Sequence, residues 1–217
     1  MTKPRFASVV LDVDSTVSGI EGIDWLARRR GSDIAANIAR LTADAMRGAI
    51  PLENVYGRRL ALIEPTRAEI DALSQAYIAA LAPDCPETIA ALQKAGVAIA
   101  LVSGGIRQAL LPLSRQLGVD AAALHAVDIE FDEAGKYKRF DTSSPLTTSA
   151  GKGIVVARLG LTRPALAVGD SHTDLAMRPV VDSFAAFTGF VTRDAVIQGA
   201  DSVVKSFHDL EATVLGG

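Results

Sequence analysis

Two aspartates directly follow an apolar run near the start of the chain, and this segment limits the possible folds more than any other. The run is Phe6-Ala7-Ser8-Val9-Val10-Leu11, and the segment after it is Asp12-Val13-Asp14-Ser15-Thr16. Such a run predicts a buried strand. Because side chains at i and i+2 of a strand share a face, Asp12 and Asp14 are expected to point into one site at its carboxyl end, where open α/β sheets bind ligands. Alone, the pair is equally typical of a turn with solvated carboxylates.

A second buried-strand run, Ile99 to Val102, ends in Ser103-Gly104-Gly105 before an apolar, helix-like segment. A hydroxyl followed by glycines at a strand-to-helix turn offers an O–H donor and accessible backbone N–H groups at a helix N-terminus. These groups suit a phosphate dianion. By itself this segment is equally well explained as a serine N-cap in a tight turn.

Two further segments complete the pattern. Gly151-Lys152-Gly153 begins another helical stretch, and a lysine at that end is disfavoured by the helix dipole, so an anionic partner explains it better than solvent does. The run Ala165 to Val168 leads into Gly169-Asp170-Ser171-His172-Thr173-Asp174, a third strand end with two carboxylates. The chain thus carries Asp and Asp, Ser, Lys, then Asp and Asp at four strand ends or helix starts.

This order and spacing resembles the haloacid dehalogenase-like phosphohydrolases, whose pattern is DxDxT, then S or T, then Lys, then GDxxxD. Within that superfamily the sequence is most similar to the phosphoserine phosphatases, over nearly the whole chain. The segments that carry the resemblance are DVDSTVSGIEGID (12–24), AMRGAIPLENVYGRRLALI (45–63), Ser103 to Gly105, Gly151 to Gly153 and Gly169 to Asp174. The resemblance implies a phosphomonoesterase that converts O-phospho-L-serine to L-serine and phosphate, the last step of serine biosynthesis.

The resemblance also implies roles for the core residues. Asp12 attacks phosphorus to form an aspartyl phosphate, and Asp14 protonates the leaving alkoxide and then takes a proton from the attacking water. The expected phosphate-binding groups are Ser103, the Gly104 amide and Lys152. A phosphomonoester is a dianion, so a carboxylate can approach it only when charge is screened, and Mg²⁺ is the expected cofactor. Its expected ligands are Asp12, the backbone carbonyl of Asp14, Asp170 and Asp174.

Substrate choice is expected to come from other residues. An amino acid headgroup needs an anion for its ammonium group and a planar cation for its carboxylate. The matching positions are Glu21 and Arg59, with Met46 and Gly48 helping to line the pocket and Thr173 lying near the phosphate. For either charged residue alone, a solvated helix surface is the simpler interpretation.

Three residues in or near these motifs are not explained by the roles given above. Ser171 stands where the family commonly has glycine, and because serine adopts a positive φ reluctantly, we expect a slightly rearranged metal loop. His172 is expected to have no catalytic duty, since Asp14 already serves as the base. Phe190 is apolar in a loop where a small or polar residue is expected, and the sequence offers no account of it.

The pattern of apolar residues along the chain changes after Thr16. Residues 17–82 have helical spacing punctuated by Pro51 and Pro65 and predict an inserted helical cap. From Pro83 onward, helices and strand runs alternate, which predicts an α/β fold with a Rossmann-like, mostly parallel sheet covered by helices on both faces. The expected domains are a discontinuous core, 1–16 and 83–217, and the cap, 17–82. Residues 127–140 predict a hairpin.

Composition excludes some function classes without choosing among the rest. The net charge of −3 offers no basic field for nucleic acid or an anionic membrane. No apolar run approaches the roughly 18 residues of a membrane span. A single cysteine, Cys85, fits a reducing compartment, so we expect a soluble, cytoplasmic protein whose partner is a small phosphorylated amino acid. The sequence does not indicate an oligomeric state.

Three alternatives to phosphoserine hydrolysis stay open. The same chemistry would serve a phosphatase or phosphotransferase for another small phosphorylated amino acid or alcohol. A phospho-accepting receiver-like signalling module also uses a strand-end Asp, Mg²⁺, a hydroxyl and a lysine, although it needs neither Asp14 nor a cap. A binding protein that has lost catalysis is disfavoured, because every expected catalytic residue is present.

Overall fold

A six-stranded parallel sheet forms the core of the computed structural model, which describes residues 3–216. The strand order is β3-β2-β1-β6-β7-β8. The six strands are β1 (Ser8–Leu11), β2 (Ala98–Ile106), β3 (Leu124–Val127), β6 (Ala165–Gly169), β7 (Ser183–Phe187) and β8 (Ser202–Val204). Chain order reverses at β1, which pairs with β2 on one side and β6 on the other. The predicted α/β class with a parallel sheet is therefore confirmed, and the reversal puts the ligand-binding crevice at the carboxyl ends of these three strands.

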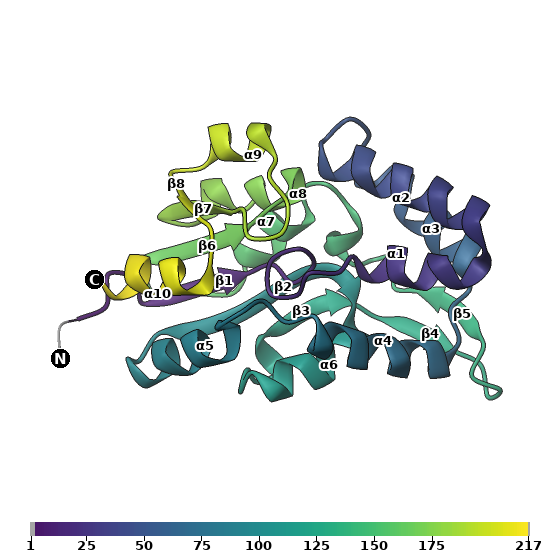
Figure 1. Cartoon of the computed structure of the whole chain (residues 1–217), viewed down its shortest axis with the longest axis horizontal. Coiled ribbons are helices and arrows are strands. Elements are labelled where there is room, and N and C mark those ends of the chain that lie inside the picture. The colour runs from purple at the N-terminus through teal and green to yellow at the C-terminus, as the bar shows by residue number, and fades with distance from the viewer. Residues whose placement is uncertain (1–2, 217) are drawn as a thin grey trace.

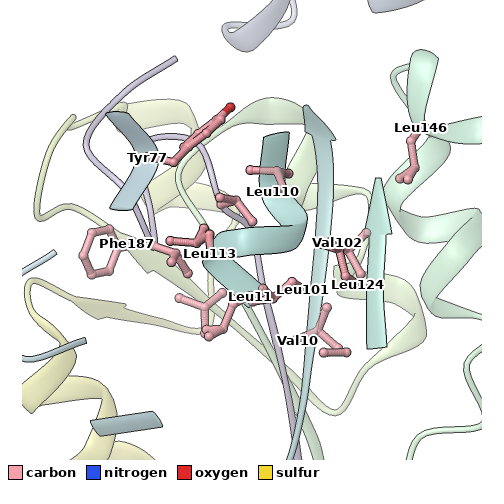
Figure 2. Close-up of a cluster of buried hydrophobic side chains, with 14 of the residues drawn as sticks. Val10, Leu11, Tyr77, Leu101, Val102, Leu110, Leu113, Leu124, Leu146 and Phe187 are labelled. Carbon is pink, nitrogen blue, oxygen red and sulfur yellow. The ribbon is translucent and has the colours of Figure 1, made fainter. Parts of the chain in front are cut away.

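Helices cover both faces of the sheet, as predicted (Figure 1). One face is covered by α5 (Cys85–Lys94), α6 (Arg107–Gln116) and α10 (Phe207–Leu215), and the other by α7 (Gly151–Val156), α8 (His172–Leu175) and α9 (Asp194–Gly199). Where α6 packs on the sheet, apolar side chains of β1, β2 and α6 contact one another, including Val10, Leu11, Leu101, Leu110 and Leu113 (Figure 2). A sheet covered on both faces requires strands that are apolar throughout, and all four residues of β1 are buried.

The helices expected from residues 17–82 form a group at one end of the molecule, over the carboxyl ends of the strands (Figure 1). They are α1 (Gly22–Ala27), α2 (Ser32–Met46), α3 (Tyr56–Ile63) and α4 (Arg67–Ala79), with short 3-10 turns at Arg28–Arg30 and Leu52–Asn54. Further 3-10 turns lie in the core at Ala121–Ala123, Pro145–Thr147 and Arg178–Val180. Thr66 and Glu69 form a reciprocal capping box that starts α4.

The two chain segments that link these helices to the core run beside each other. Gly19 N–H donates to the Ala80 carbonyl over 2.8 Å, and Ala82 N–H donates to the Val17 carbonyl over 2.9 Å. Ser18 adds a side-chain hydrogen bond of 2.9 Å to the Tyr77 carbonyl. The paired linkers begin and end close to the expected cap boundaries, 17 and 82.

The predicted hairpin is confirmed as β4 (Ile129–Phe131) paired antiparallel with β5 (Tyr137–Phe140). It is separate from the main sheet and packs against the helical group. The Phe140 ring lies 5.3 Å from the Tyr56 ring, and Arg67 N–H donates to the Gly135 carbonyl over 2.9 Å. The hairpin therefore forms a second support for the helices that carry the expected substrate residues.

One expected local structure differs in detail. We expected Ser103-Gly104-Gly105 at a strand-to-helix turn, but β2 continues through these residues to Ile106 and α6 begins only at Arg107. The register of β2 against β3 shifts between Val102 and Ile106. The glycines therefore lie in an irregular strand end, where a missing side chain allows close approach of a ligand.

Candidate active site

The carboxyl ends of β1, β2 and β6 form the floor of a pocket, and α1 to α3 lie over it. Residues from the floor include Asp12, Asp14, Gly104, Lys152, Asp170 and Thr173. Residues from the helices over it include Glu21, Met46, Tyr56 and Arg59. The pocket thus joins core and helical group, because segments far apart in sequence meet at the reversal of strand order.

Lys152 lies between two carboxylates at the floor of the pocket. Its ammonium nitrogen is 2.6 Å from Asp12 and 2.5 Å from Asp174, and all three side chains are buried. Burial and repulsion from Asp174 raise the pKa of Asp12 well above its usual value, against the opposing effect of Lys152. Burial alone would lower the pKa of Lys152, but the two carboxylates outweigh it and hold that pKa above its ordinary value. Lys152 therefore has two carboxylate partners, in line with the expectation that a lysine at this helix start needs an anion.

Asp170 is held by one hydroxyl and one guanidinium. Thr16 donates to its carboxylate over 3.2 Å, and Arg193 pairs with the same carboxylate and also donates to the Asp170 carbonyl over 3.1 Å. Burial and the neighbouring Asp174 raise the pKa of Asp170 to about 7. A carboxyl group with this pKa is only partly ionised near neutral pH, so additional positive charge would favour its ionised form.

Asp14 accepts three hydrogen bonds. Gly22 N–H and the Tyr77 hydroxyl each donate to one oxygen over 2.7 Å, and the Ser103 hydroxyl donates to the other over 3.1 Å. Tyr77 comes from α4, and its hydroxyl points away from the apolar cluster (Figure 2). Any side chain at Gly22 would collide with that hydroxyl. The carboxylate of Asp14 is thus oriented from both the core and the helical group.

The two charged residues expected to bind an amino acid both lie in the pocket. Ser15 donates to Glu21 over 2.8 Å, and burial followed by repulsion from Asp14 raises the pKa of Glu21 to about 8. Arg59 is 4% exposed and donates from Nη1 to the Thr42 hydroxyl over 2.8 Å. Its Nε is buried with no hydrogen-bond partner among residues 3–216. Arg59 itself lines the pocket, and a buried guanidinium with an unpaired donor is suited to bind an anion.

Most of the predicted site residues lie at this pocket. Asp12, Asp14, Glu21, Met46, Arg59, Gly104, Lys152, Asp170 and Thr173 line it. Ser103 and Asp174 lie behind the lining and hydrogen-bond to Asp14 and Lys152. Gly48 is placed elsewhere: it is not among the residues that line the pocket, and its backbone packs against the His172 ring.

Ser171 needs no glycine-like backbone angle in this structure. Ser171 is extended, with φ −120°, and forms a capping box with Asp174 at the start of α8. Its hydroxyl donates to the Asp174 carboxylate over 2.6 Å. A serine therefore replaces glycine here without a positive φ and adds a hydrogen bond that orients Asp174.

The structure also accounts for Phe190. Its ring lies directly over Gly19 in the first linker, so close that a Cβ at Gly19 would be 2.7 Å from the ring. The ring also contacts that of Phe187, at 6.0 Å between centroids, and 39% of the residue is exposed. Phe190 thus packs between the core and the linker.

Sequence reasoning missed four residues that contact the site: Thr42, Tyr56, Tyr77 and Arg193. For Arg193 a signal exists, since it follows β7, the strand next to β6, and strand ends of a parallel sheet share one edge. For Tyr77 the helical spacing of α4 indicates only a buried helix face, and that pattern contains nothing about the hydroxyl.

The carboxylates at the floor of the pocket fit a metal ion. Oxygens of Asp12, Asp170 and Asp174 lie within 4.8 Å of one another, and all three residues are buried. Including Asp14, four carboxyl groups lie here, and the ion pairs among residues 3–216 provide them with two cations, Lys152 and Arg193. An all-oxygen donor set with uncompensated negative charge suits a hard divalent cation.

Comparisons with known proteins agree with this geometry. The model of the haloacid dehalogenase-like hydrolase family matches residues 9–179. A phosphoserine phosphatase from Bos taurus is 34% identical over 206 residues, which cover 94% of this chain and 91% of the relative. A solved phosphoserine phosphohydrolase-like protein from Francisella tularensis superposes with a TM-score of 0.86 at 23% identity, covering 94% of this chain and 98% of the other.

A second solved structure is described as a phospho-aspartyl intermediate analogue of phosphoserine phosphatase. It superposes with a TM-score of 0.79 at 22% identity and covers 96% of this chain and 98% of the other. At these identities the solved structures establish the fold, whereas the family match and the Bos taurus relative establish descent. The chain belongs to the haloacid dehalogenase-like hydrolases and, among them, to the family of the phosphoserine phosphatases.

Proposed function

We propose that this chain hydrolyses O-phospho-L-serine to L-serine and phosphate through an aspartyl phosphate formed on Asp12, in a reaction that requires Mg²⁺. The observation that carries the proposal is the combination of two kinds of group in one pocket. A carboxylate and lysine cluster suited to a phosphoryl group lies at the floor, and a buried glutamate and a buried arginine with an unpaired Nε lie above it. Opposite charges above the floor match the ammonium and carboxylate of an amino acid.

The residues at the floor divide the chemistry between them. Asp12 is the nucleophile, and the phosphoryl oxygens are held by Lys152, the Gly104 amide and the Ser103 hydroxyl. Asp14 gives a proton to the leaving serine oxygen and then accepts one from the water that attacks the aspartyl phosphate. Gly22 N–H and the Tyr77 hydroxyl hold its carboxyl group in one orientation for both transfers, and the single proton of the Ser103 hydroxyl is donated to the phosphoryl oxygen when substrate binds. Thr173 lies beside the phosphate.

We assign the metal site to Asp12, Asp170 and the backbone carbonyl of Asp14, with Asp174 next to it. Bound Mg²⁺ would screen the charge of the phosphate dianion, so that the Asp12 carboxylate can approach it. The site offers only oxygen ligands and an excess of carboxyl groups over cations, and Mg²⁺ prefers such ligands. Lys152 and Arg193 form ion pairs with two of these residues, Asp12 and Asp170.

We also propose that residues 17–82 act as a cap over the pocket. The paired linkers at both ends of this segment support a common hinge, and Phe190 packs on one of them. No helix within residues 3–216 is long and apolar enough to cross a membrane. We place the enzyme in the cytoplasm, where a free buried thiol such as that of Cys85 stays reduced. Descent from a hydrolase family disfavours the receiver-like alternative.

Phosphate release measures this proposal. Purified protein is assayed with and without Mg²⁺ on O-phospho-L-serine and on small phosphate esters that lack the amine, the carboxylate or both. We expect the highest kcat/KM with O-phospho-L-serine, complete loss in excess chelator, and a fall of roughly 10³-fold or more in Asp12→Asn. Asp71→Asn, an exposed carboxylate on α4, is the matched control. Full activity in chelator or in Asp12→Asn would exclude the mechanism.

A further inference from the structure

Three of the cap helices each contribute one side chain to a short hydrogen-bonded chain. Arg59 of α3 donates from Nη1 to the hydroxyl of Thr42 on α2 over 2.8 Å, and that hydroxyl donates to Asp24 of α1 over 2.5 Å. The donor directions are unambiguous. A guanidinium has no acceptor, so the Thr42 oxygen must accept from it, and the single hydroxyl proton then goes to the carboxylate.

This chain fixes the orientation of the Arg59 guanidinium. One of its edges is held against α2 by Thr42, while the buried Nε has no partner and the residue lines the pocket. Arginine has several rotatable bonds, so ordering such a side chain costs conformational entropy. A guanidinium that the protein itself holds in place avoids that loss when an anion binds.

The hydroxyl also separates the two charges. If Asp24 paired directly with Arg59, the carboxylate would occupy the guanidinium donors and neutralise the charge that attracts a substrate anion. With Thr42 between them, Asp24 stabilises the arrangement through the hydroxyl. Thr42 is only 4% exposed, so water cannot readily replace this hydroxyl.

We propose that Thr42 is a positioning residue that determines specificity: with Asp24 as its anchor, it holds Arg59 ready to bind the carboxylate of the substrate. The inference rests on the proposed function, since it takes a carboxylate-bearing phosphate ester as the substrate. It adds a residue and a geometry that the family motifs do not contain.

The test compares Thr42→Val, which keeps the shape and removes the hydroxyl, with Thr42→Ser, which keeps the hydroxyl. Thr88→Val is the matched control, because Thr88 is 1% exposed and its hydroxyl donates to the Phe207 carbonyl in the core. Each variant is assayed on O-phospho-L-serine and on O-phosphoethanolamine, which differs only in lacking the carboxylate. Thermal melting confirms that each variant is folded.

In Thr42→Val we expect KM for O-phospho-L-serine to rise roughly ten- to hundredfold, the range for losing one hydrogen bond to a charged group, with a much smaller change in kcat. The kcat/KM for O-phosphoethanolamine should stay within about twofold of the parent, because its binding does not use Arg59. Thr42→Ser should return KM to near the parent value, and Thr88→Val should leave both substrates unaffected. A merely structural role would lower activity on both esters equally, and that result would overturn the inference.

Binding of L-serine, measured by calorimetry on the parent and on Thr42→Val, separates this inference from the proposed function. A parent that does not hydrolyse O-phospho-L-serine would refute the proposed function. If that parent still binds L-serine more tightly than Thr42→Val does, the positioning role is supported on its own. Equal binding by the two proteins, or no binding by either, refutes the positioning role whatever the turnover.

Discussion

Replacing Arg59 tests the side of the pocket formed by α1 to α3 most directly. The change Arg59→Ala removes the only residue proposed to bind the substrate carboxylate, and Arg59→Lys keeps a positive charge but loses the planar fork. Neither variant alters the carboxylate and lysine cluster at the floor. The structure therefore predicts selective damage, in which recognition of the amino acid is lost while phosphoryl chemistry survives.

The expected magnitude follows from the surroundings of the side chain. Arg59 is 4% exposed and lines the pocket, so a substrate carboxylate at its guanidinium would make a buried, charge-assisted contact. Losing one partner of such a contact costs about 2 to 5 kcal/mol, which corresponds to a loss of roughly 30- to 5,000-fold in kcat/KM. Arg59→Lys should lose roughly tenfold, since the ammonium is a point charge that cannot bind in the bidentate mode.

Steady-state hydrolysis of O-phospho-L-serine and of O-phosphoethanolamine provides the assay, and Arg58→Ala provides the control. Arg58 lies on the same helix, α3, but is exposed, so its removal changes net charge and helix composition equally. We expect Arg58→Ala to behave as the parent on both esters. If folded Arg59→Ala hydrolyses O-phospho-L-serine as efficiently as the parent, the carboxylate assignment is refuted, and a Mg²⁺-dependent phosphomonoesterase of other specificity would remain.

Three further predictions concern single groups of the pocket. Asp14→Asn keeps the volume and the acceptor for Gly22 and Tyr77, so the melting temperature should change little while kcat falls by roughly 10²-fold or more; near-normal turnover would exclude Asp14 as the proton carrier. His172→Ala should retain most activity with an unchanged pH profile, because the exposed ring packs on a glycine of the cap, and loss of an ionisation near neutral pH would contradict this. Burial and repulsion from Asp14 raise the pKa of Glu21 to about 8, so this carboxyl group is mostly neutral below that pH and mostly anionic above it. We therefore expect KM for O-phospho-L-serine to rise as the pH falls from 8 toward neutrality. This pH dependence of KM should disappear in Glu21→Gln and for an ester without the amine.

The positions and roles of the strand-end motifs could be predicted from the sequence because they depend on only a few neighbouring residues. An apolar run that ends in Asp12 and Asp14 specifies both a buried strand and the direction of the two side chains, and the same holds for Asp170 after β6. A lysine at the start of a helix needs an anion, and Lys152 has two. The residues of each motif are only a few positions apart, and over such short spacings the backbone geometry of a strand or helix is nearly invariant.

Predictions that depended on a backbone angle or on a long-range neighbour were less successful. A rearranged loop was expected at Ser171, and the sequence did not show that a capping box with Asp174 would keep this residue extended. Gly48 was expected at the pocket from the family resemblance, yet in the turn after α2 its backbone packs against the His172 ring. The environment of Phe190 depends on Gly19, which is separated from it by most of the chain.

The sequence by itself therefore determined the α/β class, the parallel sheet, the inserted helices and the chemistry of the residues at the strand ends, because periodicity and short motifs act over one element. Only the tertiary structure decided which polar groups face one another across elements. The Thr42 hydroxyl between Asp24 and Arg59, the Tyr77 hydroxyl on Asp14 and the pairing of Arg193 with Asp170 all join separate helices or loops. Such contacts depend on the angles at which whole elements pack, and many side chains share in setting those angles.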